Sequence, residues 1–176
     1  MKHALPHCRS IICMCLSGIG DALTFTPFLA ALKAARPEIA IDMLVMFRSA
    51  ESLFQAHAAV RETFFVNFLG QSSLRSLRDV LRLRARGYDA SVVALPANRW
   101  EYNLVQTLLC TRTIGHRYHH RDIANVNFIK RHWVWEDESR HVVEQNLDLL
   151  QFFGVARPED PGPLAMHLTD DDHAAA

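Results

Sequence analysis

The chain has 176 residues, of which 49% are hydrophobic and 22% are charged. These proportions are typical of one globular domain and exclude an intrinsically disordered chain. The longest apolar stretch, residues 11–16, is too short to cross a bilayer, and the basic N-terminus lacks the pattern of a signal peptide. We therefore expect a cytoplasmic protein.

The net charge is zero, but the charges are unevenly distributed. Residues 1–135 hold 17 Lys/Arg and 9 Asp/Glu, whereas residues 136–176 hold 2 and 10. A basic body suits an anionic partner such as a phosphorylated ligand, a nucleic acid or a lipid headgroup. The two regions could instead face each other, or another domain, and cancel. Because the sequence has no helix-turn-helix spacing, zinc finger or paired RNA-binding aromatics, we expect no nucleic-acid partner.

Apolar runs alternate with helical patterns along the chain. Strands are expected at 8–15, 39–46, 62–66, 88–95 and 112–116, and helices at 27–36, 49–56, 73–86, 100–110 and 140–153, with a long irregular stretch at 117–138. Thr26 before Pro27 is a favourable helix start. This alternation predicts an α/β domain over residues 1–156, with a Rossmann-like, three-layer, doubly wound and mostly parallel sheet.

Residues 157–176 have a different composition. Pro158, Pro161, Gly162 and Pro163 are typical of a linker, and the pattern at the very end suggests another helix start. We expect this segment to be a linker leading to a second domain that the chain does not contain.

Four cysteines are present, and two of them, Cys13 and Cys15, are separated by one residue on an expected strand. Zinc-binding cysteines usually have two to four residues between them, so this pair is a poor metal site. We expect buried, reduced thiols and no bound metal.

The loop Ser17-Gly18-Ile19-Gly20-Asp21 follows the first expected strand. Ligands of doubly wound sheets bind beyond the carboxyl ends of the strands, and glycines there let the backbone turn tightly and approach a ligand. The third glycine of a dinucleotide fingerprint is replaced by Leu23, and the Gly-Lys-Ser/Thr ending of a P-loop is missing. Asp21 could brace the loop or a helix start, or act as a general base, and spacing alone does not decide.

Three segments of the sequence carry a shared pattern. They are Ser17-Gly18-Ile19-Gly20-Asp21-Ala22-Leu23 with Thr26-Pro27, Leu32-Lys33, Pro37 and Ile41-Asp42; Tyr88-Asp89-Ala90-Ser91-Val92-Val93; and His141-Val142-Val143-Glu144-Gln145-Asn146-Leu147-Asp148-Leu149-Leu150 with Gly154-Val155. Together they resemble one enzyme family, glycosyltransferase family nine, which contains the ADP-heptose:lipopolysaccharide heptosyltransferases and their relatives. The first segment resembles the opening of that family, the second its central strand and the third the helix that ends its first domain.

The resemblance implies the N-terminal, acceptor-binding half of a GT-B enzyme with two Rossmann-like domains facing a cleft. The missing half would bind a nucleotide sugar such as ADP-heptose. Heptose or a related sugar would pass, with inversion and without a metal or cofactor, to a phosphorylated glycolipid of the lipopolysaccharide inner core. Asp21 would be the catalytic base, and the acceptor site would include Ser17, Gly18, Gly20 and Thr24. Peripheral contact with the inner membrane surface is also expected.

A non-catalytic nucleotide- or anion-binding Rossmann-like module remains the alternative. It would keep the fold and the basic cleft while performing no chemistry.

Basic side chains follow the fourth and fifth expected strands. We expect Arg99, Arg117, His120 and Arg121 to contact the acceptor, because a long irregular loop with several cations suits a phosphate or carboxylate. A metal site is disfavoured since no acidic or cysteine ligands accompany these histidines in the sequence.

The expected helix at 73–86 carries four arginines on one face, and two tryptophans lie in the irregular stretch. The arginine face is either simply solvated or contacts an anionic glycolipid surface. The tryptophans could stack on a sugar, or pack beneath the last helix. These residues are Arg75, Arg78, Arg82, Arg86, Trp133 and Trp135.

Overall fold

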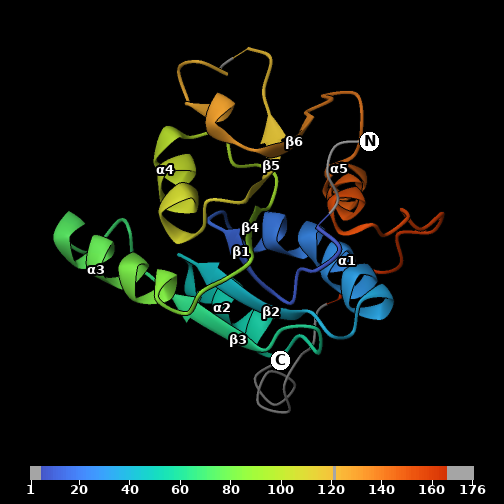
Figure 1. Cartoon of the computed structure of the whole chain (residues 1–176), viewed down its shortest axis with the longest axis horizontal. Helices are drawn as coiled ribbons and strands as arrows, with labels where there is room; N and C mark the ends of the chain where they lie inside the picture. Colours follow the sequence, from blue (N-terminus) through green and yellow to red (C-terminus); the bar gives the residue numbers. More distant parts are fainter. Residues whose placement is uncertain (1–4, 121, 166–176) are drawn as a thin grey trace.

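The computed structural model describes residues 5–120 and 122–165. In this part of the chain six strands form one sheet in the order β3-β2-β1-β4-β5-β6, and every neighbouring pair is parallel (Figure 1). The strands are β1 Ser10–Cys15, β2 Ala40–Val45, β3 Glu62–Phe65, β4 Ala90–Val93, β5 Thr113–Arg117 and β6 His132–Trp135. The predicted α/β class with a doubly wound parallel sheet is confirmed.

Helices cover both faces of the sheet. Those of the first face pack on one apolar cluster and those of the second face on another. The first face carries α1 Ile19–Ala35, α2 Arg48–Gln55 and α5 Val142–Asp148, and the second α3 Ser73–Arg84 and α4 Trp100–Leu109. Two short 3₁₀ helices, Asn127–Ile129 and Leu149–Phe153, complete the described elements.

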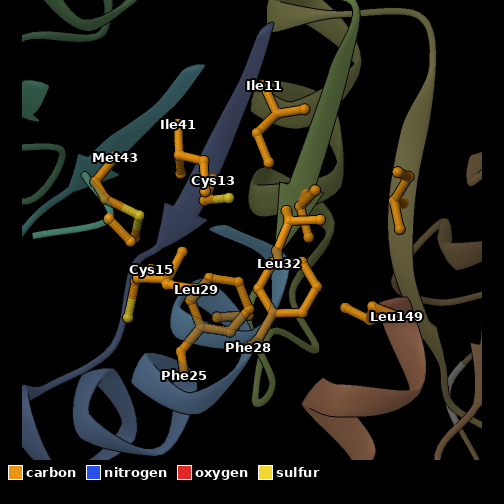
Figure 2. Close-up of a cluster of buried hydrophobic side chains, with 14 of the residues drawn as sticks. Ile11, Cys13, Cys15, Phe25, Phe28, Leu29, Leu32, Ile41, Met43 and Leu149 are labelled. Atoms are coloured by element: carbon orange, nitrogen blue, oxygen red, sulfur yellow. The ribbon is translucent and has the colours of Figure 1, made fainter. Parts of the chain in front are cut away.

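Strand β1 is buried on both faces. Ile11, Cys13 and Cys15 point toward α1, where Phe25 and Phe28 pack against them (Figure 2), whereas the alternate residues of the strand belong to the cluster under α3 and α4. All four cysteines are buried free thiols, as the sequence predicted. In residues 5–120 and 122–165 no helix is both long and apolar enough to span a membrane.

Helix α1 begins at Ile19, so the prediction of a helix starting at Pro27 is wrong. Proline has no N–H, which leaves the carbonyl of Leu23 without its helical hydrogen bond. The Thr26 hydroxyl donates to that carbonyl at 2.8 Å and thereby replaces the missing bond. Consequently Gly20 and Asp21 lie in the first turn of a helix and not in a loop.

The stretch 117–138 was predicted to be irregular, yet it contains β6. This strand lies at the sheet edge, and its register places Trp133 beside Gly115 of β5. Its four residues are too few to show a clear period, which explains the error. The last expected helix, 140–153, is divided into α5 and a 3₁₀ segment that ends at Gly154, whose φ is +71°.

Candidate functional site

The strand order reverses between β1 and β4, because the chain adds β2 and β3 on one side of β1 and then β4 and β5 on the other. The loops that follow two such neighbouring strands diverge, and the opening between them is where doubly wound proteins bind ligands. Here those loops carry Ser17 and Gly18 after β1, and Arg99 after β4. The sequence-predicted residues of both loops therefore lie at the same switch point of the sheet.

The start of α1 is uncovered. Gly18 is the N-cap, with φ −68° and ψ 177°, and no side chain among the described residues caps the helix. A Cβ built on Gly18 or on Gly20 would meet no atom of the described residues within 4 Å. Neither glycine has the positive φ of a tight turn, so the prediction that these glycines are needed for the backbone to turn tightly is wrong. What they leave is open space at a helix N-terminus, where backbone N–H groups favour an anion.

The Asp21 side chain is half-buried in the first turn of α1. Among the described residues its carboxylate has no hydrogen bond or ion pair, so it does not cap the helix. The Thr24 hydroxyl donates to the backbone carbonyl of Asp21 at 2.7 Å, and the Ser17 hydroxyl lies 3.7 Å from the Cys15 sulfur. A carboxylate at this position is stabilised by the helix dipole and keeps both oxygens available to a ligand.

Arg99 is the N-cap residue of α4, and its side chain is 59% exposed. One turn later the Tyr102 hydroxyl donates to the carbonyl of Leu16 at 3.3 Å, which ties the start of α4 to the end of β1. The Arg99 guanidinium lies 5.8 Å from the Tyr102 ring centroid and 3.4 Å from Glu101. Arg99 thus belongs to the same part of the sheet edge as Ser17, although sequence reasoning did not find the Tyr102 anchor.

Arg117 is less available than the sequence suggested. Its guanidinium pairs with Asp122, which raises the pKa of the arginine and lowers that of the carboxyl group. It also lies 4.5 Å from the ring centroid of Trp133 and 4.9 Å from that of Trp135. Any contact of Arg117 with an acceptor therefore competes with Asp122. Arg121 lies outside the described residues.

His120 lies among carboxylates. Its Nδ1 is 3.8 Å from the carboxylate of Glu138, and Glu136 offers a third ligand atom within 4.8 Å of the other two. Burial and the neighbouring Glu138 raise the pKa of Glu136. The sequence argument that acidic ligands are missing near this histidine is wrong, because β6 brings them there. These neighbours suit a cation better than the phosphate that was expected at His120.

Lys130 is buried, with 3% of its surface exposed. Gly115 leaves room for its side chain, whose ammonium donates to the Asn127 side chain at 2.7 Å. Burial lowers the pKa of Lys130 to about 7. Asn103 of α4 also donates to Asn127, at 2.8 Å, so this network holds the loop after β5 against α4.

No protein-family model and no curated protein sequence matches the chain. Solved structures do. A family 9 glycosyltransferase from Veillonella parvula superposes with a TM-score of 0.73 and 20% identity, over 93% of this chain and 46% of the other. The chain has the fold of these family 9 structures. The predicted resemblance is thereby confirmed at the level of the fold.

Two Escherichia coli enzymes give similar values. Heptosyltransferase WaaC, solved with ADP, has a TM-score of 0.71 and 19% identity over 86% of this chain and 49% of its own. ADP-heptose lps heptosyltransferase II has a TM-score of 0.72 and 16% identity over 94% of this chain and 49% of its own. The chain spans about half the length of the solved structures that it matches.

The open helix start leads to a stability prediction. Replacing Gly20 by Ala should raise the free energy of unfolding by up to about 1 kcal/mol, because alanine is the better helix former and its methyl group meets nothing. Gly87→Ala is the matched control. Gly87 has φ +72°, so the same methyl group should there lower the free energy of unfolding by about 1 kcal/mol. Urea denaturation measures both, and a destabilising Gly20→Ala would contradict the open helix start.

Lys130 gives a prediction about pH. Its pKa is about 7 in the folded chain and 10.5 ordinarily, so between these values the unfolded chain binds a proton that the folded chain lacks. The lysine therefore makes stability rise with pH, and this gain is absent below about pH 7. From pH 7 to 8.5 the wild type should gain about 1 to 2 kcal/mol relative to Lys130→Met. Denaturation at both pH values tests this, and parallel pH dependences would show that Lys130 keeps an ordinary pKa.

Proposed function

We propose that the chain is the acceptor-binding half of an inverting glycosyltransferase. In this proposal it transfers heptose or a related sugar from a nucleotide-sugar donor to a phosphorylated glycolipid of the lipopolysaccharide inner core, in the cytoplasm at the inner membrane surface. The observation that carries it is the Asp21 carboxylate at the start of α1 and at the switch point of the sheet, which has no hydrogen bond or ion pair within residues 5–120 and 122–165. The shared fold of the heptosyltransferase structures supports the same activity.

Asp21 is the proposed general base. It accepts the proton of an acceptor hydroxyl while that oxygen forms a bond to the anomeric carbon of the donor sugar. The bond between the anomeric carbon and the diphosphate oxygen breaks, the electron pair leaves with the nucleoside diphosphate, and the anomeric carbon is inverted. The nucleotide sugar would be ADP-heptose, bound by a donor half outside this chain, and the step is proposed to need no metal ion or other cofactor.

The remaining residues would position the acceptor. The backbone N–H groups at Gly18 and Gly20 are open to an anionic group, and Arg99 can bind a phosphate from the neighbouring loop. Ser17 and Thr24 border the same helix start and can hydrogen-bond sugar hydroxyls. Arg117 is the last residue of β5 and His120 follows that strand, so they would contact only a more distant part of the acceptor.

The test is a transfer assay on the enzyme that contains both halves. Asp21→Asn should lower the turnover number about 10²- to 10⁴-fold while changing acceptor affinity little, because it removes the base and keeps the shape. Arg99→Gln should instead weaken acceptor binding about tenfold or more. Arg9→Gln, at the opposite edge of the sheet, is the control and should change neither quantity.

Near-wild-type turnover by Asp21→Asn would contradict the assignment of the base. If instead the enzyme with both halves transferred no sugar although the chain bound phosphorylated ligands, the alternative of a non-catalytic anion-binding module would be favoured.

A further inference from the structure

Helices α3 and α4 carry exposed apolar side chains that do not belong to the hydrophobic core. Val80 and Leu83 of α3 pack in the apolar cluster against the sheet. Other leucines of the same helix are exposed to solvent, and Leu74 is 81% exposed. The other large apolar side chains exposed here are Leu69, Leu77, Leu81, Trp100 and Leu104. We call these six residues the α3–α4 face. The two helices lie side by side (Figure 1), and the Arg84 side chain joins them by donating to the carbonyl of Leu108 at 2.7 Å.

The spacing of the leucines on α3 produces a continuous stripe. Leu74, Leu77 and Leu81 are separated by three and four residues, so they project from one side of the helix. Each leucine is followed directly by an arginine, which places a second stripe of Arg75, Arg78 and Arg82 beside the first. A helix with an exposed leucine stripe bordered by arginines is typical of elements that lie in the interface of a membrane.

The arginine stripe is largely free to bind anions. Among the described residues, the Arg75 and Arg78 side chains have no hydrogen bond or ion pair. The Arg82 guanidinium has one long ion pair, at 3.7 Å from the Asp79 carboxylate. A second copy of the chain on this face would bring two arginine stripes together, which repel each other. An anionic lipid surface complements both the charge and the leucines.

A groove connects this face with the candidate site. It has a volume of about 380 Å³ and runs between α3 and α4, with an apolar lining that includes Leu77 and Leu104. Leu16 and Arg99 line it as well, next to the switch point of the sheet. A lipid-anchored acceptor at the membrane would therefore be close to the site that holds its headgroup.

From these observations we infer that the α3–α4 face docks the chain on a bilayer that contains anionic lipids, with the leucines inserted among the headgroups and the arginines paired to phosphates. The delivery of a glycolipid acceptor to Asp21 rests on the proposed function, whereas docking itself does not require it.

The test is cosedimentation of the 176-residue chain with acceptor-free vesicles. Binding should be several-fold stronger to mixed phosphatidylglycerol and phosphatidylcholine vesicles than to phosphatidylcholine alone, and weaker at high salt. The triple change Leu74→Gln, Leu77→Gln and Leu81→Gln should reduce binding about tenfold or more. A matched triple change at exposed apolar residues elsewhere, Ile123→Gln, Phe128→Gln and Leu164→Gln, should reduce it less than twofold.

Charge is tested in the same way. Arg75→Gln with Arg78→Gln should abolish the preference for anionic vesicles, whereas Arg9→Gln with Arg131→Gln, at the amino-terminal edge of the sheet, should keep it. Circular dichroism confirms that each variant is folded, which these exposed positions should permit.

Equal binding of the wild type and the leucine variant would overturn the proposal. So would self-association that the leucine variant loses without any vesicle binding, because it would assign the face to a second copy. Neither result bears on the turnover of Asp21→Asn with a delipidated acceptor, so a failure of docking and a failure of the proposed transfer can be told apart.

Discussion

The burial of β1 between β2 and β4 is the constraint on which the rest of the structure depends. Its side chains are buried on both faces, and its parallel neighbours direct their carboxyl ends to the same sheet edge. The chain must therefore leave the core at Ser17 and immediately enter α1. Because the strand order reverses beside this point, the loop after β4 diverges there and exposes the start of the helix to ligands.

The site is built from backbone as much as from side chains. In the part of the chain that the structure describes, a helix start without a capping side chain, two glycines whose added Cβ would meet nothing within 4 Å, and one carboxylate without a partner lie within a single helical turn. A globular domain gains little stability from such an arrangement, since a capping side chain and an alanine would each serve the helix better. The lower helix stability is explained if a ligand binds in the space at Gly18 and Gly20, with Asp21 beside it.

The sequence predicted the sheet because long apolar runs separated by helical patterns have few other solutions. The sequence placed the start of the first helix wrongly because proline is common at a first helical position. Only the structure shows that the Thr26 hydroxyl replaces the hydrogen bond to the Leu23 carbonyl that Pro27 cannot make. Likewise β6 was too short to recognise, and with it the carboxylates near His120 were missed. Residues close along the chain, such as Ser17 and Asp21, were predictable together, whereas the partner of Arg117 depends on how a long loop folds.

In the proposed function, an anionic acceptor binds at the start of α1 and beside α4. Amide chemical shifts of the chain, titrated with a delipidated phosphorylated sugar acceptor of the lipopolysaccharide inner core at low salt, measure this most directly. The largest changes are expected at Gly18, Gly20, Asp21 and Arg99, with little change along β3. Saturable changes confined to other surfaces, or no changes at all, would contradict it.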